Sequence, residues 1–147
     1  MKKFLLGLGF TLVLTGCGGK TLTCTMEESE SGMEMKAKTV YKFDSNGENV
    51  KKANVEMSVK VDDEAKKTLE TIGMSMEDLS SSFSEKFDDY KEAGIDVKTK
   101  TTDNSLSFKA NIDVNKLTDE QLEDIDLNDI NYEEVKKDLE ESGFTCK

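Results

Sequence analysis

The sequence contains no histidine, proline or tryptophan, and each of its 20 positively charged residues is a lysine. Without histidine, the Ser-His-Asp and Cys-His arrangements of nucleophilic catalysis cannot be built, and neither can histidine-ligated zinc sites. Without arginine, the chain lacks the best bidentate ligand for phosphate and guanine. The 31 acidic residues outnumber the lysines, whereas a nucleic-acid-binding protein needs a basic surface. We therefore expect no nucleic-acid partner.

Long apolar runs are also missing, since the longest is the short segment Phe4 to Leu14, which follows Lys2 and Lys3. A helix over this run would reach about 16 Å at ~1.5 Å per residue. The hydrocarbon core of a bilayer is about 30 Å thick, so the run is too short for a transmembrane anchor. A basic start, a short apolar centre and small residues at its end are typical of a secretory signal peptide.

The residues Leu14-Thr15-Gly16-Cys17 close this segment and resemble the lipobox of bacterial lipoproteins. The resemblance implies that the Cys17 thiol receives a diacylglyceryl group and becomes the new N-terminus. We predict a signal peptide over residues 1–16, a lipidated tether over 17–21 and a single lipoprotein domain over 22–147. We expect this domain on the extracytoplasmic side of the cell membrane, anchored by its lipid.

Removal of the signal peptide leaves 18 lysines and 31 acidic residues, which is a net charge of −13. A charge of this sign predicts a domain that stands away from anionic lipid rather than lying flat on it.

Three cysteines are present, and assigning Cys17 to the lipid leaves Cys24 and Cys146. An even pair in an exported chain predicts a disulfide, here between the two ends of the folded region. The alternative is two free, buried thiols. The chain has no Cys-x-x-Cys spacing, so nothing indicates thiol redox catalysis.

Alternation of apolar and polar residues predicts most of the strands. The predicted strands cover residues 22–26, 33–43, 50–61, 95–102, 105–114 and 144–146. Residues 29–32 are expected to form a turn, and Asn46-Gly47 is a hairpin signal. Helical spacing and capping residues predict helices over 62–73, after Ser75 as far as Gly94, after Thr118, and from Asn131 to Gly143. We expect an α+β fold, an antiparallel sheet of five to six strands with helices packed on one face.

The order of these elements also resembles a known family. The residues that carry the likeness are Gly32 to Val50 with Tyr41 and Phe43, Gly94-Ile95, Val114 to Leu122, and the ending Leu139 to Phe144. They are similar to the YehR-like family of small bacterial lipoproteins. The resemblance implies an α+β lipoprotein domain whose role is not established, and it assigns no functional residues.

Two short patterns could bind metal. Met33-Glu34-Met35 and Met74-Ser75-Met76 carry thioethers that favour Cu(I), although Met33 and Met35 fall on the apolar face of a predicted strand, where methionine is a common core residue. Residues 124–129 begin like a calcium loop but have Asp129 where glycine is required and Val135 in place of the final glutamate. We therefore expect no metal and no cofactor.

Neighbouring acids such as Asp62/Asp63 and Glu133/Glu134 stand at predicted helix starts, where exposed carboxylates are expected. No serine has the Gly-x-Ser-x-Gly setting. The sequence thus predicts a monomeric, non-catalytic, lipid-anchored domain with a binding or structural role in the cell envelope. The alternative is a carrier of a small ligand or metal, with a pocket between the sheet and the helix that bears Phe83, Phe87 and Tyr90.

Overall fold

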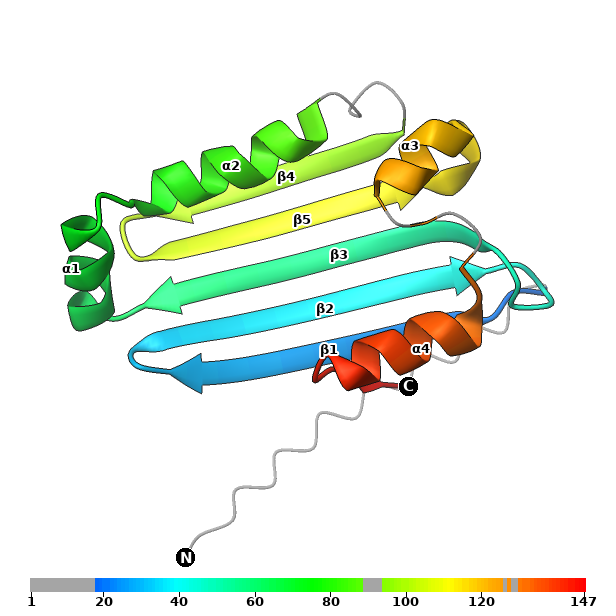
Figure 1. Cartoon of the computed structure of the whole chain (residues 1–147), viewed down its shortest axis with the longest axis horizontal. Helices are drawn as coiled ribbons and strands as arrows, with labels where there is room; N and C mark the ends of the chain where they lie inside the picture. The colour runs from blue at the N-terminus through cyan, green and yellow to red at the C-terminus, as the bar shows by residue number, and fades with distance from the viewer. Residues whose placement is uncertain (1–17, 89–93, 126, 128–129) are drawn as a thin grey trace, which may run out of the picture.

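The computed structural model of the protein describes residues 18–88, 94–125, 127 and 130–147. These residues form an antiparallel sheet with the strand order β4-β5-β3-β2-β1-β6 (Figure 1). The strands are β1 (Thr21–Glu30), β2 (Met33–Phe43), β3 (Val50–Val61), β4 (Ile95–Thr102), β5 (Ser105–Asp113) and β6 (Thr145–Cys146). The helices are α1 (Asp63–Thr71), α2 (Met76–Asp88), α3 (Asp119–Asp124) and α4 (Tyr132–Glu141). The predicted α+β fold class is confirmed.

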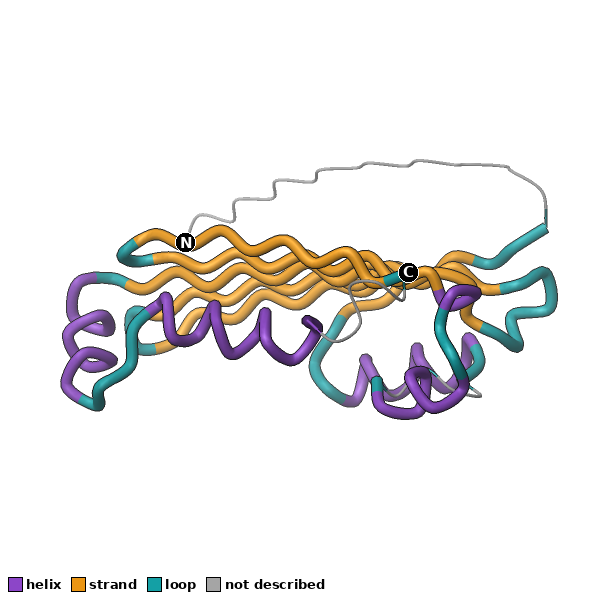
Figure 2. The backbone as a smooth tube through the Cα atoms, turned by 90° about the horizontal axis from the view of Figure 1, so that it is seen from above, coloured by secondary structure: helices purple, strands orange, loops and turns teal. Residues whose placement is uncertain are grey.

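The four described α-helices all lie on one side of the sheet, and the other side carries none of them (Figure 2). This arrangement follows from the alternation along each strand, because successive side chains point to opposite faces. The side chains that point toward the helices include Leu22, Ala53, Ile95, Leu106 and Ile112, all of which are buried.

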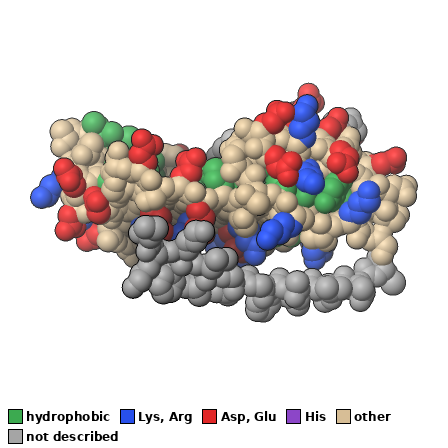
Figure 3. All heavy atoms as spheres, turned by 90° about the horizontal axis from the view of Figure 1, so that it is seen from below, with side chains coloured by type: hydrophobic (Ala, Val, Ile, Leu, Met, Phe, Trp, Pro, Cys, Tyr) green, Lys and Arg blue, Asp and Glu red, His purple; other side chains and the backbone are tan. Residues whose placement is uncertain are grey.

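The core has two parts because the helices cover the two ends of the sheet separately. One part joins Leu22, Phe43 and Ile112 to Val135 of α4. The other joins Val61 and Leu106 to Ala65 of α1 and to Met76 at the start of α2. Seen from the β1 edge, the helix-bearing side rises at both ends and dips between them (Figure 3).

The turn between β1 and β2 is shorter than the sequence indicated. Only Ser31 and Gly32 connect the strands, with φ angles of 50° and 78°. Positive φ at both central residues is the type I′ geometry, whose twist matches that of the paired strands. The predicted turn over residues 29–32 is therefore wrong by two residues, and β1 continues to Glu30 in register with Met33.

The Asn46-Gly47 signal correctly marks a hairpin, but the connection is longer than a two-residue turn. It runs from Asp44 to Asn49 between β2 and β3, and the register shifts between Lys42 and Phe43. The carboxylate of Asp44 organises the loop by accepting hydrogen bonds from the Gly47 and Glu48 amides, both at 2.9 Å.

The predicted capping residues begin the helices. Asp62 accepts from the Glu64 and Ala65 amides at the start of α1, and Ser75 from the Asp78 amide near the start of α2. Thr118 and Asn131 each take part in a capping box, at α3 and α4.

The end of α1 differs from the prediction. In the predicted helix over 62–73, Ile72 follows Ala65 and Leu69 at helical spacing, which places it on the apolar face. In the structure it is instead the C-cap residue of α1 and is 64% exposed. Within the described residues, no helix is long and apolar enough to cross a membrane.

Candidate functional site

The predicted lipid attachment residue, Cys17, lies outside the described residues, but the residues that follow it are well defined. The amide of Phe43 donates to the Lys20 carbonyl at 2.8 Å, and the amide of Lys20 donates to the Asp44 carbonyl at 3.4 Å. A Cβ at Gly19 would lie 2.6 Å from the Phe43 carbonyl oxygen, so only glycine allows this close approach. The first described residues are thus docked against the end of β2.

One backbone hydrogen bond and contacts among the side chains of Lys20, Phe43 and Tyr132 link this end of the sheet to α4. The amide of Tyr132 donates to the Gly47 carbonyl at 2.9 Å. The Tyr132 ring packs edge-on against Phe43 with centroids 5.5 Å apart, and the Lys20 ammonium lies 5.5 Å from the Tyr132 ring centroid. The Asn49 side chain, together with neighbouring amides, lowers the pKa of Asp44 to about 2. The loop beside the first described residues is therefore held by several independent contacts.

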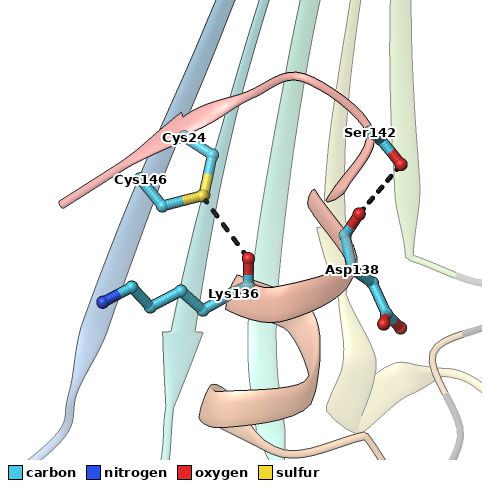
Figure 4. The surroundings of a disulfide bond; sticks show 5 residues. All are labelled: Cys24, Lys136, Asp138, Ser142 and Cys146. Carbon is cyan, nitrogen blue, oxygen red and sulfur yellow. Dashed lines mark hydrogen bonds between the residues drawn. A yellow bond between two sulfur atoms is a disulfide. The ribbon is translucent and has the colours of Figure 1, made fainter. Parts of the chain in front are cut away.

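The predicted disulfide between Cys24 and Cys146 is present and joins β1 to β6 (Figure 4). The two strands are in register at this pair, and the Lys147 amide donates to the Thr23 carbonyl at 2.8 Å. Figure 4 also shows α4 beside the disulfide, with the Lys136 carbonyl 4.0 Å from the Cys146 sulfur. Cys24 is completely buried, so the bond closes the core at the edge of β1.

The helix-free face of the sheet is rich in lysine. The strand registers place its outward side chains in rows that run across the sheet. Its eight lysines, which we call the lysine face, are Lys36, Lys38, Lys42, Lys52, Lys60, Lys98, Lys100 and Lys109, and all are exposed. The same face carries five acidic residues, Glu27, Glu34, Glu56, Asp96 and Asp113. It therefore has a net charge of +3 in a protein whose total charge is −11.

Ion pairs neutralise most of these acids. Lys36 contacts Glu34 at 3.0 Å and Glu27 at 3.7 Å. The hydrogen bond between Lys36 and Glu34 raises the pKa of Lys36 and lowers that of Glu34.

Two further ion pairs lie on this face, Lys109 with Glu56 and Lys98 with Asp96. The other five lysines, Lys38, Lys42, Lys52, Lys60 and Lys100, form no ion pair with the described residues. Most of the unpaired charge on this face is therefore positive.

A shallow trough of about 600 Å³ crosses this face. It is lined by residues 25–27, 36–38, 56–58, 98–100 and 107–109. The central residue of each triplet points toward the helices, so its backbone forms the floor. The residues on either side of it project from the helix-free face and form two rows of walls, which include Lys38, Lys98 and Lys109 on one side and Lys36 and Lys100 on the other.

Comparison with known protein families finds a match at the N-terminus of the chain. Residues 1–17 match the family model for the prokaryotic membrane lipoprotein lipid attachment site. This chain carries a lipoprotein attachment site. The match ends on Cys17, and it supports a lipid-anchored membrane protein. No curated protein sequence matches the chain.

A search of solved structures finds matches that include two NMR structures. An NMR structure of the YehR protein of Escherichia coli superimposes with a TM-score of 0.55 and 21% identity, over 88% of this chain and 92% of that one. An NMR structure of a protein from Streptococcus pneumoniae TIGR4 has a TM-score of 0.45 and 18% identity, over 100% of this chain and 97% of that one. The first comparison supports the predicted YehR-like fold, and at this identity it shows the fold alone.

The structure separates the methionines that could bind metal. Met33 and Met35 lie on the helix side of β2 and line a groove beside Ala65 and Leu69 of α1. Met33 is 39% exposed, so it is not the core residue that the alternation suggested. In the second pair, Met74 is exposed and Met76 is buried. No group of three or more histidine, cysteine or acidic side chains that could hold a metal ion occurs in the described part of the chain.

The remaining sequence candidates fall into two groups. The carboxylate of Asp62 caps α1 and that of Glu134 completes the capping box of α4, whereas Asp63 and Glu133 lie in the first turns of these helices. Residues 126, 128 and 129 of the calcium-like loop lie outside the described residues, as do Tyr90 and the side chains of Phe83 and Phe87. The predicted ligand pocket beside those aromatic residues therefore stays a prediction.

The lysine face was not recognised as one surface from the sequence. Its signal was present, because the outward residues of each predicted strand include lysines. Only the registers between β2, β3, β5 and β4 place them side by side.

Proposed function

We propose that this protein is a non-catalytic lipoprotein that is anchored through Cys17 on the extracytoplasmic side of the membrane and has a binding or structural role in the cell envelope. The attachment-site match over residues 1–17 carries this proposal. A diacylglyceryl group supplies two acyl chains, which is enough for stable anchoring, whereas a single chain is marginal.

The disulfide supports the extracytoplasmic placement. Disulfides persist in oxidising compartments and are rare in the cytosol. The Cys24–Cys146 bond joins the first strand to the last and is protected by the burial of Cys24. A bond in this position is structural rather than catalytic, since the chain has no Cys-x-x-Cys motif.

The carboxyl groups support a non-catalytic role. A general acid near neutral pH needs a raised pKa. The described carboxyl groups with shifted pKa values are Glu34, Asp44 and Asp78, and all three are lowered. The largest cause is a neighbouring donor in each case, namely the side chain of Lys36, Asn49 or Ser75. These groups act as hydrogen-bond acceptors that fix local structure.

Mass spectrometry and membrane fractionation test the anchor. The native protein should partition into membranes and begin at an acylated Cys17, and the Cys17→Ser variant should lose both properties. The matched control is the Cys24→Ser/Cys146→Ser variant, which removes two other cysteines and should still be acylated. An unmodified Cys17 in the native protein would contradict the proposal.

The extracytoplasmic placement needs its own measurement. A membrane-impermeant amine reagent applied to intact cells, or to spheroplasts if an outer membrane is present, should label exposed lysines on the helices, such as Lys67 and Lys137. Labelling that appears only after cell lysis would place the domain on the cytoplasmic side.

A second candidate function, transport of a small ligand, is favoured by the groove beside α1. This groove has a volume of about 430 Å³, and its lining includes Met33, Met35 and Leu69 as well as Glu28 and Glu30. Native mass spectrometry of the purified protein tests it. A bound molecule that disappears in a Met35→Glu variant would support the carrier role, and an empty native protein would contradict it.

A further inference from the structure

Charge is divided between the two sides of the molecule. Within their bounds, the four helices contain 16 acidic residues and five lysines, whereas the opposite side carries the eight lysines of the lysine face and five acids. Figure 3 shows acidic side chains distributed over the helix-bearing side. The net charge of the chain therefore describes neither side, because one is strongly negative and the other is positive.

The lipid attachment site restricts how far the domain can move from the membrane. Only residues 18–20 separate Cys17 from β1, and fully extended they span about 10–11 Å. Hydrogen bonds dock Lys20 against Phe43 and Asp44, which shortens the free length. The first described residues leave the end of the sheet on the side opposite the helices (Figure 2). The described chain therefore begins at the end of the sheet, on its lysine-rich side.

We propose that the lysine face lies against the anionic headgroups of the membrane that holds the lipid anchor. This inference rests on the proposed lipidation of Cys17. Membranes that contain anionic lipids have a negative surface potential and attract nearby lysines. Screening limits this attraction to about 10 Å at 0.1 M salt, so the side that contacts the surface decides the interaction. An approach through the helices would bring their acidic residues toward like charge.

The details of the face suit a charged planar surface. Five lysines of this face form no ion pair with described residues and are free to contact headgroups, namely Lys38, Lys42, Lys52, Lys60 and Lys100. Val40 is the one apolar residue among the outward positions of β2, so the contact is electrostatic rather than an insertion into the hydrocarbon. The trough lies between two rows of side chains, and each row contains one of these five lysines, Lys38 in one and Lys100 in the other. The two acids that line it, Glu27 and Glu56, are paired with Lys36 and Lys109.

Amine labelling of the full lipoprotein in vesicles tests the orientation. The protein is reconstituted into vesicles of phosphatidylcholine alone or with 30% phosphatidylglycerol, treated with an acetylating reagent and analysed by mass spectrometry. In the anionic vesicles we expect Lys38, Lys52 and Lys100 to react at least threefold more slowly than in the neutral ones. Lys67 and Lys137, on the helices, should react equally in both. Addition of 0.5 M NaCl should abolish the protection.

A pair of variants separates a surface effect from a general one. Lys38→Gln/Lys100→Gln should reduce the protection of Lys52 in anionic vesicles. The control variant Lys67→Gln/Lys137→Gln changes the total charge equally and should leave that protection unchanged. Equal labelling of both faces, or selective protection of the helix lysines, overturns the proposal.

Two further outcomes distinguish a failure of the proposed function from a failure of the proposed membrane contact. A protein that is not acylated will not be retained by the vesicles, which contradicts the proposed function before any orientation is measured. Protection of Lys38 and Lys100 on intact cells but not in anionic vesicles overturns the membrane contact and points to a protein or polymer on this face instead.

Discussion

Removal of the Cys24–Cys146 disulfide should cause a large loss of stability that originates mainly in the unfolded state. The bond closes a loop with a sequence separation of 122 residues. In the chain-entropy model, a loop of this length lowers the entropy of the unfolded chain by about 16 cal/mol/K, which is about 5 kcal/mol at 25 °C. Since native domains are stable by only about 5–15 kcal/mol, this bond would supply a substantial share.

Urea unfolding in a Cys17→Ser background measures this effect without the lipid or the third thiol. Three forms are compared, namely the oxidised protein, the reduced protein and the Cys24→Ala/Cys146→Ala variant. If the urea m-value is about 2 kcal/mol/M, the midpoint of the reduced protein should fall by roughly 2.5 M. The alanine variant should lose more, because Cys24 is completely buried and its sulfur leaves a cavity.

The comparison between the reduced protein and the Cys24→Ala/Cys146→Ala variant is the control. Reduction breaks the cross-link but keeps both sulfur atoms, so it isolates the effect of loop closure from that of packing. A loss below about 1 kcal/mol on reduction would refute the entropic reasoning and indicate that the unfolded chain retains contacts between its ends.

Three further substitutions test the local interactions, again by urea unfolding. The pKa of Asp44 is lowered from 3.8 to about 2 in the folded protein. Its carboxylate therefore stabilises the fold fully above the unfolded pKa, and this stabilisation is lost as the pH falls toward 2. In the Asp44→Asn variant, the urea midpoint should decline less steeply over that pH range. Asn131→Ala removes a capping box and should cost about 1 kcal/mol, whereas Asn131→Ser should retain most of it. Leu22→Ala should cost about 2–5 kcal/mol since Leu22 is completely buried, against less than about 0.5 kcal/mol for the exposed Thr25→Ala.

Local physical chemistry made most elements predictable. The segment Met33–Phe43 alternates between apolar and polar residues, and β2 has these bounds. Helix starts were equally clear. Three residues after Thr118 and three residues after Asn131 stand side chains that can complete a capping box, Gln121 and Glu134. In both cases the signal lies within a few residues and does not depend on the rest of the fold.

The misjudged positions lie where local signals are weak. Residues 27–30 of β1 are all polar, so alternation could not extend the strand past Met26. Pairing with the well-patterned β2 holds them in the sheet. Ile72 has the spacing of a core residue but falls after the last turn of α1, where no neighbouring element covers it. The sequence does not contain this information because it depends on where other elements pack.

The candidate site likewise has one part that local sequence signals predict and one part that depends on the fold. The attachment site is a linear signal, so it was predictable from residues 1–17. The lysine face depends on pairings between segments far apart in the chain, such as Lys38 to Glu56 and Glu56 to Lys109. The net charge alone predicts a domain that stands away from anionic lipid, and this prediction takes no account of how the sheet and the helices divide the charge.

Lysines on a sheet have an alternative explanation, because charged side chains on edge strands prevent sheets from joining edge to edge. That reason fits Lys98 and Lys100, which lie on the edge strand β4. It does not apply to β2, β3 and β5, which are paired on both sides and contain the other six lysines of the face. Within these central strands neither edge protection nor core packing requires a positive charge. The membrane contact differs from edge protection in what it predicts, because it makes Lys38 of β2 as sensitive to anionic lipid as Lys100 of β4, whereas edge protection predicts no response to lipid at either position.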